Sequence, residues 1–158
     1  MNDRIVINAS PLIALGKMGL LELARELPMV FVTPAEVKHE LDAGVRSGHL
    51  IEFPEWVEVR KLSLPIDRSI FDRLDSGEAA VIQLALEIGV DTVCLDEIKG
   101  RRIAKELGLS VTGSLGILGK AKKLGMVNEV KPVILTAIQK GIYYDNQLVE
   151  RFLREMGE

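Results

Sequence analysis

The stretch DSGEAAVIQLALEIGVDTVCLDE, residues 75–97, constrains the fold of this chain more than any other. Residues 79–88 are apolar on almost every side, which predicts a buried helix. A β-rich run, 92–95, follows a glycine and ends at Asp96. If this strand runs back antiparallel to the helix, Glu78 in the first helical turn lies near Asp96. Two carboxylates that meet at one edge of a sheet indicate a functional site.

The composition limits the class of protein. A chain of 158 residues, 47% of them hydrophobic, can bury the core of one domain, which we expect over residues 1–158. No apolar run is long enough to span a bilayer and the first residues lack the order of a secretory signal, so we expect a cytoplasmic protein without membrane contact. The single cysteine, Cys94, is expected in the core. A net charge of −3 argues against a broad basic surface for nucleic acids.

Strand-like and helix-like segments alternate along the chain. Residues 4–7 and 29–32 are rich in β-branched residues, and each run precedes a helical pattern. A last short strand is expected at 110–112, and the apolar residues of 53–59 indicate a docked segment or an edge strand. This alternation predicts an α/β fold with three layers, α/β/α, around a short and mainly parallel sheet.

Capping residues predict several helix boundaries. Ser10 and Ser114 are expected as N-caps, and the TPAE sequence at 33–36 has the pattern of a capping box. Gly44 is expected to end the helix that this box begins. A further helix is expected over residues 65–74, because a proline is favoured at the first helical position.

Polar side chains collect at one edge of the predicted sheet. In an open parallel sheet, ligands bind outside the carboxyl ends of the strands. Asn8 and Asp96 each end a strand at that edge, and Glu78 begins a helix that leads into a strand. Glu40 lies in the second turn of a helix that starts at the same edge. We therefore expect these four side chains to form one cluster.

Some of these residues have competing interpretations. Glu36 shares a helix face with Glu40, so either can be the second acid, although the capping box accounts for Glu36. Asn8 is explained nearly as well by an Asx turn before the next helix as by ligand binding. Glu78 and Asp96 are also acids of the kind that stabilise helix N-termini.

The chemistry of the cluster favours a divalent cation. Carboxylates at short range raise one another's pKa, and a bound cation removes that cost. Oxygen ligands without His or Cys favour Mg²⁺ or Mn²⁺, which can activate water and neutralise a phosphate during hydrolysis. The residues therefore predict metal-dependent phosphodiester cleavage. A small-molecule binder with a doubly wound sheet is a further hypothesis, but the sequence has no glycine-rich phosphate loop.

A basic segment follows the end of the predicted strand. Lys99, Arg101 and Arg102, with Lys105 one turn later, are expected to hold an RNA backbone beside the acids. A second basic group at 120–123 is better explained as a solvated helix face. Aromatic residues make up only 4% of the chain, so base stacking contributes little to any affinity for RNA.

Four motifs occur in a fixed order along nearly the whole chain. They are INASPLIALGKMG at 7–19, DSGEAAVIQLALEIG at 75–89, CLDE at 94–97 and VTGSLGIL at 111–118. The segment 40–44 adds an E-L-x-x-G pattern. With these motifs the chain resembles the PIN-domain family, in particular a PIN-like group that has the same sequence patterns. Each motif is weak alone, but four in the same order are specific.

This resemblance implies a metal-dependent ribonuclease fold. It implies catalytic roles for Glu40, Glu78 and Asp96, which with Asn8 would hold Mg²⁺ or Mn²⁺. Residues expected to support these ligands are Ser10, Ser114 and Glu97. The family is often the toxin half of a prokaryotic toxin–antitoxin pair and is commonly homodimeric. The implied partners are therefore single-stranded or structured RNA, an antitoxin protein and a second copy of the chain.

The first acid of the family is replaced in this sequence. The residue at the end of the first strand is usually Asp, and here it is Asn8. An asparagine retains a carbonyl ligand but loses a full negative charge, so it should hold the cation less tightly. Two hypotheses follow: an active ribonuclease, or a catalytically degenerate PIN-like protein that binds RNA or a protein partner without cleavage.

Overall fold

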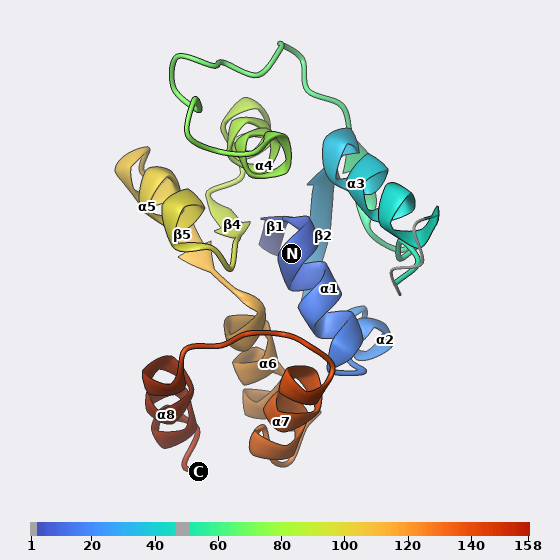
Figure 1. Ribbon diagram of the computed structural model, residues 1–158, viewed down its shortest axis with the longest axis vertical. Helices are drawn as coiled ribbons and strands as arrows, with labels where there is room; N and C mark the ends of the chain where they lie inside the picture. Colours follow the sequence, from blue (N-terminus) through green and yellow to red (C-terminus); the bar gives the residue numbers. More distant parts are fainter. Residues whose placement is uncertain (1–2, 47–50) are drawn as a thin grey trace.

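Five short strands form one sheet in the part of the chain that the structure describes, and every pairing in the sheet is parallel (Figure 1). The structure is a computed structural model and describes residues 3–46 and 51–158. The strand order across the sheet is β3-β2-β1-β4-β5. The strands are β1 (Asp3–Ile7), β2 (Met29–Pro34), β3 (Glu58–Arg60), β4 (Thr92–Cys94) and β5 (Ser110–Thr112).

Helices flank this sheet and complete the three-layer α/β/α fold that the sequence predicts (Figure 1). The edge strand β3 forms within the region where a docked segment or edge strand was expected. The helices are α1 (Ala9–Lys17), α2 (Leu21–Ala24), α3 (Ala35–Arg46), α4 (Ser76–Ile88), α5 (Ile98–Glu106), α6 (Ser114–Lys123), α7 (Lys131–Gln139) and α8 (Asn146–Glu155).

Strand β1 lies at the centre of the sheet, and both neighbours hold it in register. Val6 lies opposite Val32 of β2 and Val93 of β4, and all three side chains are fully buried. Just beyond β1, the Asn8 N–H donates to the Cys94 carbonyl at 3.1 Å. Because β1 and β4 are parallel, their carboxyl ends meet at one edge of the sheet.

Helix α4 is buried on almost all sides, as its apolar sequence predicts. Asp75 caps it by accepting the Glu78 N–H at 2.8 Å. Gly89 ends it with a φ of 69°, a conformation that residues with a Cβ rarely adopt. The helix packs on β1, β2 and β4, and its Gly77 faces the Asn8 side chain. The first turn of α4 therefore lies at the carboxyl edge of the sheet.

Two expectations from composition concern Cys94 and the membrane. Cys94 is fully buried, and this burial raises the pKa of its thiol well above the ordinary value. The prediction of a core cysteine is therefore confirmed. Among the helices of residues 3–46 and 51–158, none combines the length and the apolar character needed to cross a bilayer.

The expected helix caps are wrong in their details. Helix α1 begins at Ala9, one residue before Ser10, and α6 begins at Ser114 itself. Neither serine therefore occupies the cap position. Thr33, the first residue of the expected capping box, donates its hydroxyl to the Ile7 carbonyl at 2.6 Å. This hydrogen bond joins β2 to β1. Thr33 does not cap α3, because β2 continues through it to Pro34.

Two other boundary predictions are also wrong. Helix α3 continues past Gly44, because this glycine keeps the helical conformation instead of the left-handed one that ends helices. The helix expected over 65–74 does not form, and this segment follows an irregular path along α4. Buried Gln83 accepts the Asp67 N–H at 2.9 Å and donates to two backbone carbonyls. Just before this segment, Glu87 accepts the N–H groups of Ser63 and Leu64, so side chains of α4 satisfy part of the backbone here.

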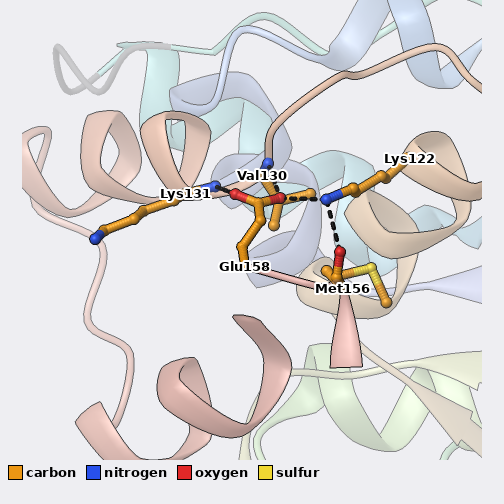
Figure 2. Close-up of polar contacts among 5 residues, drawn as sticks. All are labelled: Lys122, Val130, Lys131, Met156 and Glu158. Atoms are coloured by element: carbon orange, nitrogen blue, oxygen red, sulfur yellow. Dashed lines mark hydrogen bonds and ion pairs between the residues drawn. The ribbon is translucent and has the colours of Figure 1, made fainter. Parts of the chain in front are cut away.

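Helices α6, α7 and α8 lie together at the lower end of Figure 1, and Glu158 ties them to one another. Its carboxylate accepts the backbone N–H groups of Val130 and Lys131 at 2.8 and 3.0 Å, at the start of α7. It also pairs with Lys122 of α6 at 2.5 Å, and this lysine donates to the Met156 carbonyl (Figure 2). The Lys122 hydrogen bond and the backbone donors lower the pKa of Glu158 to about 2.

Replacing Glu158 by glutamine should lower the melting temperature at pH 7. The pKa of Glu158 is lower in the folded state than its ordinary value of 4.5, so the ionised group stabilises the fold above that pH. This contribution is lost as the pH falls toward 2, and the wild-type and Glu158→Gln melting curves should converge there. Glu155→Gln, at an exposed position of α8, is the matched control and should leave the curve unchanged. Equal melting temperatures for Glu158→Gln and wild type at pH 7 would contradict the role of this carboxylate.

Candidate active site

Asn8 lies where the first strand ends and α1 begins. It occupies the N-cap position of α1, yet its side chain makes no capping hydrogen bond within the described residues. The residue is 5% exposed, and its Oδ1 is buried without a hydrogen-bond partner in that same part of the chain. In an Asx turn or an N-cap, this oxygen would accept a hydrogen bond from a backbone N–H. The oxygen instead lies 3.3 Å from the point where a Cβ on Gly77 would stand.

Glu40 reaches the same point from α3, which packs on α4. Its Oε1 lies 2.8 Å from the position of a Cβ on Gly77, so a glycine there leaves room for both the Asn8 amide and this carboxylate. Glu40 as a whole is exposed, but its carboxylate is partly buried where it approaches Gly77. This burial, followed by the charges of Asp75 and Glu97, raises the pKa of Glu40.

Glu78 points inward from the first turn of α4 and is 4% exposed. Its Oε2 lies 2.8 Å from where a Cβ on Gly100 of α5 would stand. Burial raises its pKa most, followed by a hydrogen bond with Asp75 and the charges of Asp75 and Glu97, to about 8. In the absence of a cation, this carboxyl group therefore holds a proton at neutral pH.

Asp96 has a different environment from the other acids. The charges that act on Glu40 and Glu78 come from Asp75 and Glu97, whereas the Oδ1 of Asp96 accepts the Ser114 N–H at 2.8 Å. This hydrogen bond places the Asp96 carboxylate at the N-terminus of α6, where the helix dipole favours a negative charge. We call the edge formed by Asn8, Glu40, Glu78 and Asp96 the acidic edge. In one part of it the carboxylates repel one another, and in the other the Asp96 carboxylate accepts a backbone N–H.

The basic residues after β4 have two different environments. Lys99 and Arg102 are exposed on α5, as a role in RNA binding requires. Arg101 is half-buried, and its Nη1 donates to the carbonyls of Leu95 and Thr112 at 2.7 and 3.1 Å. This guanidinium therefore holds the ends of β4 and β5 together, a structural task that the sequence pattern did not indicate.

The supporting residues expected from the sequence are dispersed along the edge. Ser10 is half-buried in the first turn of α1, and Glu97 is an exposed residue directly before α5. Glu36 lies one helical turn before Glu40, and the contacts to Gly77 come from Glu40. Ser114 is fully buried, and its hydroxyl pairs with the Tyr144 hydroxyl at 2.5 Å.

The donor atoms at this edge have the chemistry of a site for a hard divalent cation. The unpartnered Oδ1 of Asn8 and the buried carboxyl of Glu78 are both groups that a cation would satisfy. Across residues 3–46 and 51–158, no three His, Cys, Asp or Glu side chains converge closely enough to hold a metal ion. The donor types therefore fit a hard divalent cation in chemistry.

Sequence reasoning missed two features of this edge. One is Asp75, the N-cap of α4, whose charge acts on both Glu40 and Glu78. Tyr144 was not predicted at all, because it lies in the irregular segment between α7 and α8 and has no sequence pattern around it. Only the fold brings its hydroxyl to the start of α6.

The raised pKa of Glu78 should make the stability of the cation-free protein depend on pH. The folded protein binds more protons than the unfolded chain between about pH 4.5 and pH 8, so its stability should fall as the pH rises through this window. Glu78→Gln should flatten this dependence and raise the melting temperature at pH 8. Melting curves from pH 4 to pH 9, in buffer with a chelator, measure the effect.

Glu106→Gln is the control for this experiment, because Glu106 is exposed at the end of α5. It should keep the wild-type dependence of the melting temperature on pH. If Glu78→Gln also keeps that dependence unchanged, the protonated carboxyl group is not Glu78.

The chain was also compared with known proteins. It matches the family described as DUF3368: PIN domain over residues 4–158, which is nearly its whole length. No curated protein gives a significant match. The match includes the strand end at Asn8 and the three acids Glu40, Glu78 and Asp96. On this match, the chain belongs to the PIN-domain family.

Proposed function

We propose that this protein is a metal-dependent ribonuclease with Mg²⁺ or Mn²⁺ as its cofactor. PIN domains have a nuclease-type fold, generally bind nucleic acid and generally use divalent metal ions. The observation that supports the proposal most is the buried Oδ1 of Asn8, which has no hydrogen-bond partner among the described residues. A buried acceptor that shares the space around Gly77 with a carboxylate of raised pKa is best satisfied by a cation.

Each residue has a proposed role that follows from its contacts. Asn8, Glu40 and Glu78 would hold the cation, which supplies Lewis acidity and a water of lowered pKa when bound. Asp96 binds the α6 N-terminus through Oδ1, so its Oδ2 remains to complete the ligand set or to orient the attacking water. A carboxylate that accepts a hydrogen bond through one oxygen keeps its other oxygen in a fixed direction.

The RNA strand would approach over α5. Lys99 and Arg102 are exposed there, close in sequence to Asp96, and can bind phosphate groups on either side of the scissile bond. The chain has few aromatic side chains, so binding would depend mainly on the phosphate backbone and should weaken as salt increases.

A catalytically degenerate PIN-like protein is the second candidate. The observation that favours it is the amide at position 8, because a neutral ligand compensates less cation charge than the usual aspartate. Such a protein would bind RNA or a protein partner at the same edge without cleavage.

We further propose a toxin-type role in the cytoplasm, opposed by an antitoxin protein, and a homodimeric state. The resemblance to toxin-type PIN-like sequences supports this role. Exposed apolar residues on the last two helices, Leu135, Ile138 and Leu148, offer a surface for a second copy of the chain. The reduced, buried Cys94 is compatible with a cytoplasmic protein.

Cleavage of single-stranded RNA in the presence of Mn²⁺ tests the proposal. Wild type should cut, and Asp96→Asn and Glu78→Gln should each lose roughly a hundredfold or more in rate, as the loss of a catalytic group predicts. Asn8→Asp should bind Mn²⁺ more tightly and cut faster, because it restores a full negative charge. Calorimetric titration with Mn²⁺ measures the binding separately.

The outcomes separate the two candidates. An inert wild type together with an active Asn8→Asp variant assigns the degenerate function. Cleavage that persists in Asp96→Asn and in Glu78→Gln would show that the activity does not come from this edge, and the proposed site would be wrong.

Alanine at Gly77 should damage the site without damaging the fold. A Cβ there would lie 2.8 Å from Glu40 Oε1, so this carboxylate has to move. In the helix, alanine is favoured over glycine by about 1 kcal/mol, so the melting temperature should be equal or higher. Mn²⁺ affinity and cleavage should both fall. Ser76→Ala, one position earlier on an exposed site, is the control, and wild-type Mn²⁺ affinity in Gly77→Ala would exclude Glu40 as a ligand.

A further inference from the structure

A buried pair of hydroxyl groups lies next to the acidic edge. Tyr144 Oη and Ser114 Oγ are 2.5 Å apart, at 9% and 0% residue exposure respectively. They come from different parts of the chain: Ser114 begins α6, and Tyr144 lies in the segment that joins α7 to α8. A hydrogen bond between two buried hydroxyls restrains both side chains.

Ser114 connects this pair to Asp96. Its backbone N–H donates to Asp96 Oδ1 at 2.8 Å, so one residue binds Tyr144 with its side chain and Asp96 with its main chain. The Asp96 carboxylate can approach the start of α6 this closely because residue 113 is glycine. A Cβ at that position would lie 2.5 Å from Asp96 Oδ1. The position of Asp96 therefore depends on where Ser114 and the start of α6 are held.

Tyr144 itself is held from both sides. Its neighbour Asp145 caps α8 by accepting the Leu148 N–H at 3.1 Å, which anchors the segment to that helix. Burial raises the pKa of the Tyr144 hydroxyl above its ordinary value, so the group stays protonated and keeps its hydrogen. The C-terminal helices and the acidic edge are thus joined by one chain of contacts: Asp145, Tyr144, Ser114 and Asp96.

We propose that Tyr144 is a positioning residue of the acidic edge, which fixes Ser114 and, through the Ser114 N–H, the direction of the Asp96 carboxylate. This role rests on the proposed function, in which Asp96 uses its other oxygen on the cation or the attacking water. Tyr144 does not touch that oxygen. Its effect is to keep Oδ2 pointing in one direction, in the way that outer hydrogen bonds orient metal-binding carboxylates.

Tyr144→Phe removes the hydroxyl and keeps the ring, and Tyr143→Phe is the matched control. Tyr143 is the adjacent residue and is 84% exposed. Mn²⁺ affinity, measured by calorimetry, should fall roughly tenfold to a hundredfold in Tyr144→Phe and stay unchanged in Tyr143→Phe. For RNA cleavage, kcat should fall while KM stays near wild type, because the RNA contacts on α5 are intact.

Ser114→Ala is the second variant, because it removes the other hydroxyl and leaves the tyrosine in place. It should reproduce the loss of Mn²⁺ affinity, and the Ser114→Ala/Tyr144→Phe double variant should be no worse than the single variants. Additive losses in the double variant, or wild-type Mn²⁺ affinity in folded Tyr144→Phe, would overturn the proposal.

Amide hydrogen exchange keeps this test separate from the proposed function. The Ser114 N–H, which donates to Asp96, should exchange faster in Tyr144→Phe than in wild type and Tyr143→Phe. If wild type neither binds Mn²⁺ nor cuts RNA, the proposed function fails, whereas faster exchange at this one amide still supports the positioning of Asp96. Unchanged exchange at Ser114 in Tyr144→Phe would refute the positioning role whatever the activity.

Discussion

The parallel pairing of β1 with β4 is the constraint on which the rest of the structure depends. The pairing continues one step past the strand, where the Asn8 N–H binds the Cys94 carbonyl. It forces the carboxyl ends of two buried strands to one edge, and α4 begins at that edge and runs back to the opposite edge, where β4 begins. The polar residues next to these ends therefore lie along one edge, where Asn8 and Glu78 are buried and Glu40 and Glu97 are exposed. Burying a carboxylate such as that of Glu78 costs free energy unless something compensates its charge.

The edge meets this cost in two different ways. Asp96 has a donor in the Ser114 N–H, whereas Glu40 and Glu78 face the charges of Asp75 and Glu97. An aspartate at position 8 would add a further carboxylate to the repelling part. The neutral amide of Asn8 adds no charge to that part, and under the proposed function it would attract a cation less strongly than an aspartate.

The sequence predicts the fold well, because the sheet depends on strong local patterns. Apolar strands and the nearly apolar α4 leave few alternatives to a three-layer arrangement. The residues gathered near Asn8 were also predictable, since each stands next to a strand or helix end. Contacts that join distant segments were not. The segment over 65–74 has helical residues but is held by Gln83, and Tyr144 has no local pattern that would indicate Ser114 as its partner.

The contacts of Gln83 and Glu87 also have a consequence for the order of folding. The first backbone groups of the segment before α4, among them the N–H groups of Ser63 and Asp67, bind side chains of α4. This part of the segment therefore needs a formed α4 to satisfy its backbone. We therefore expect the segment that leads to Asp75 to become ordered only after α4 has docked on the sheet.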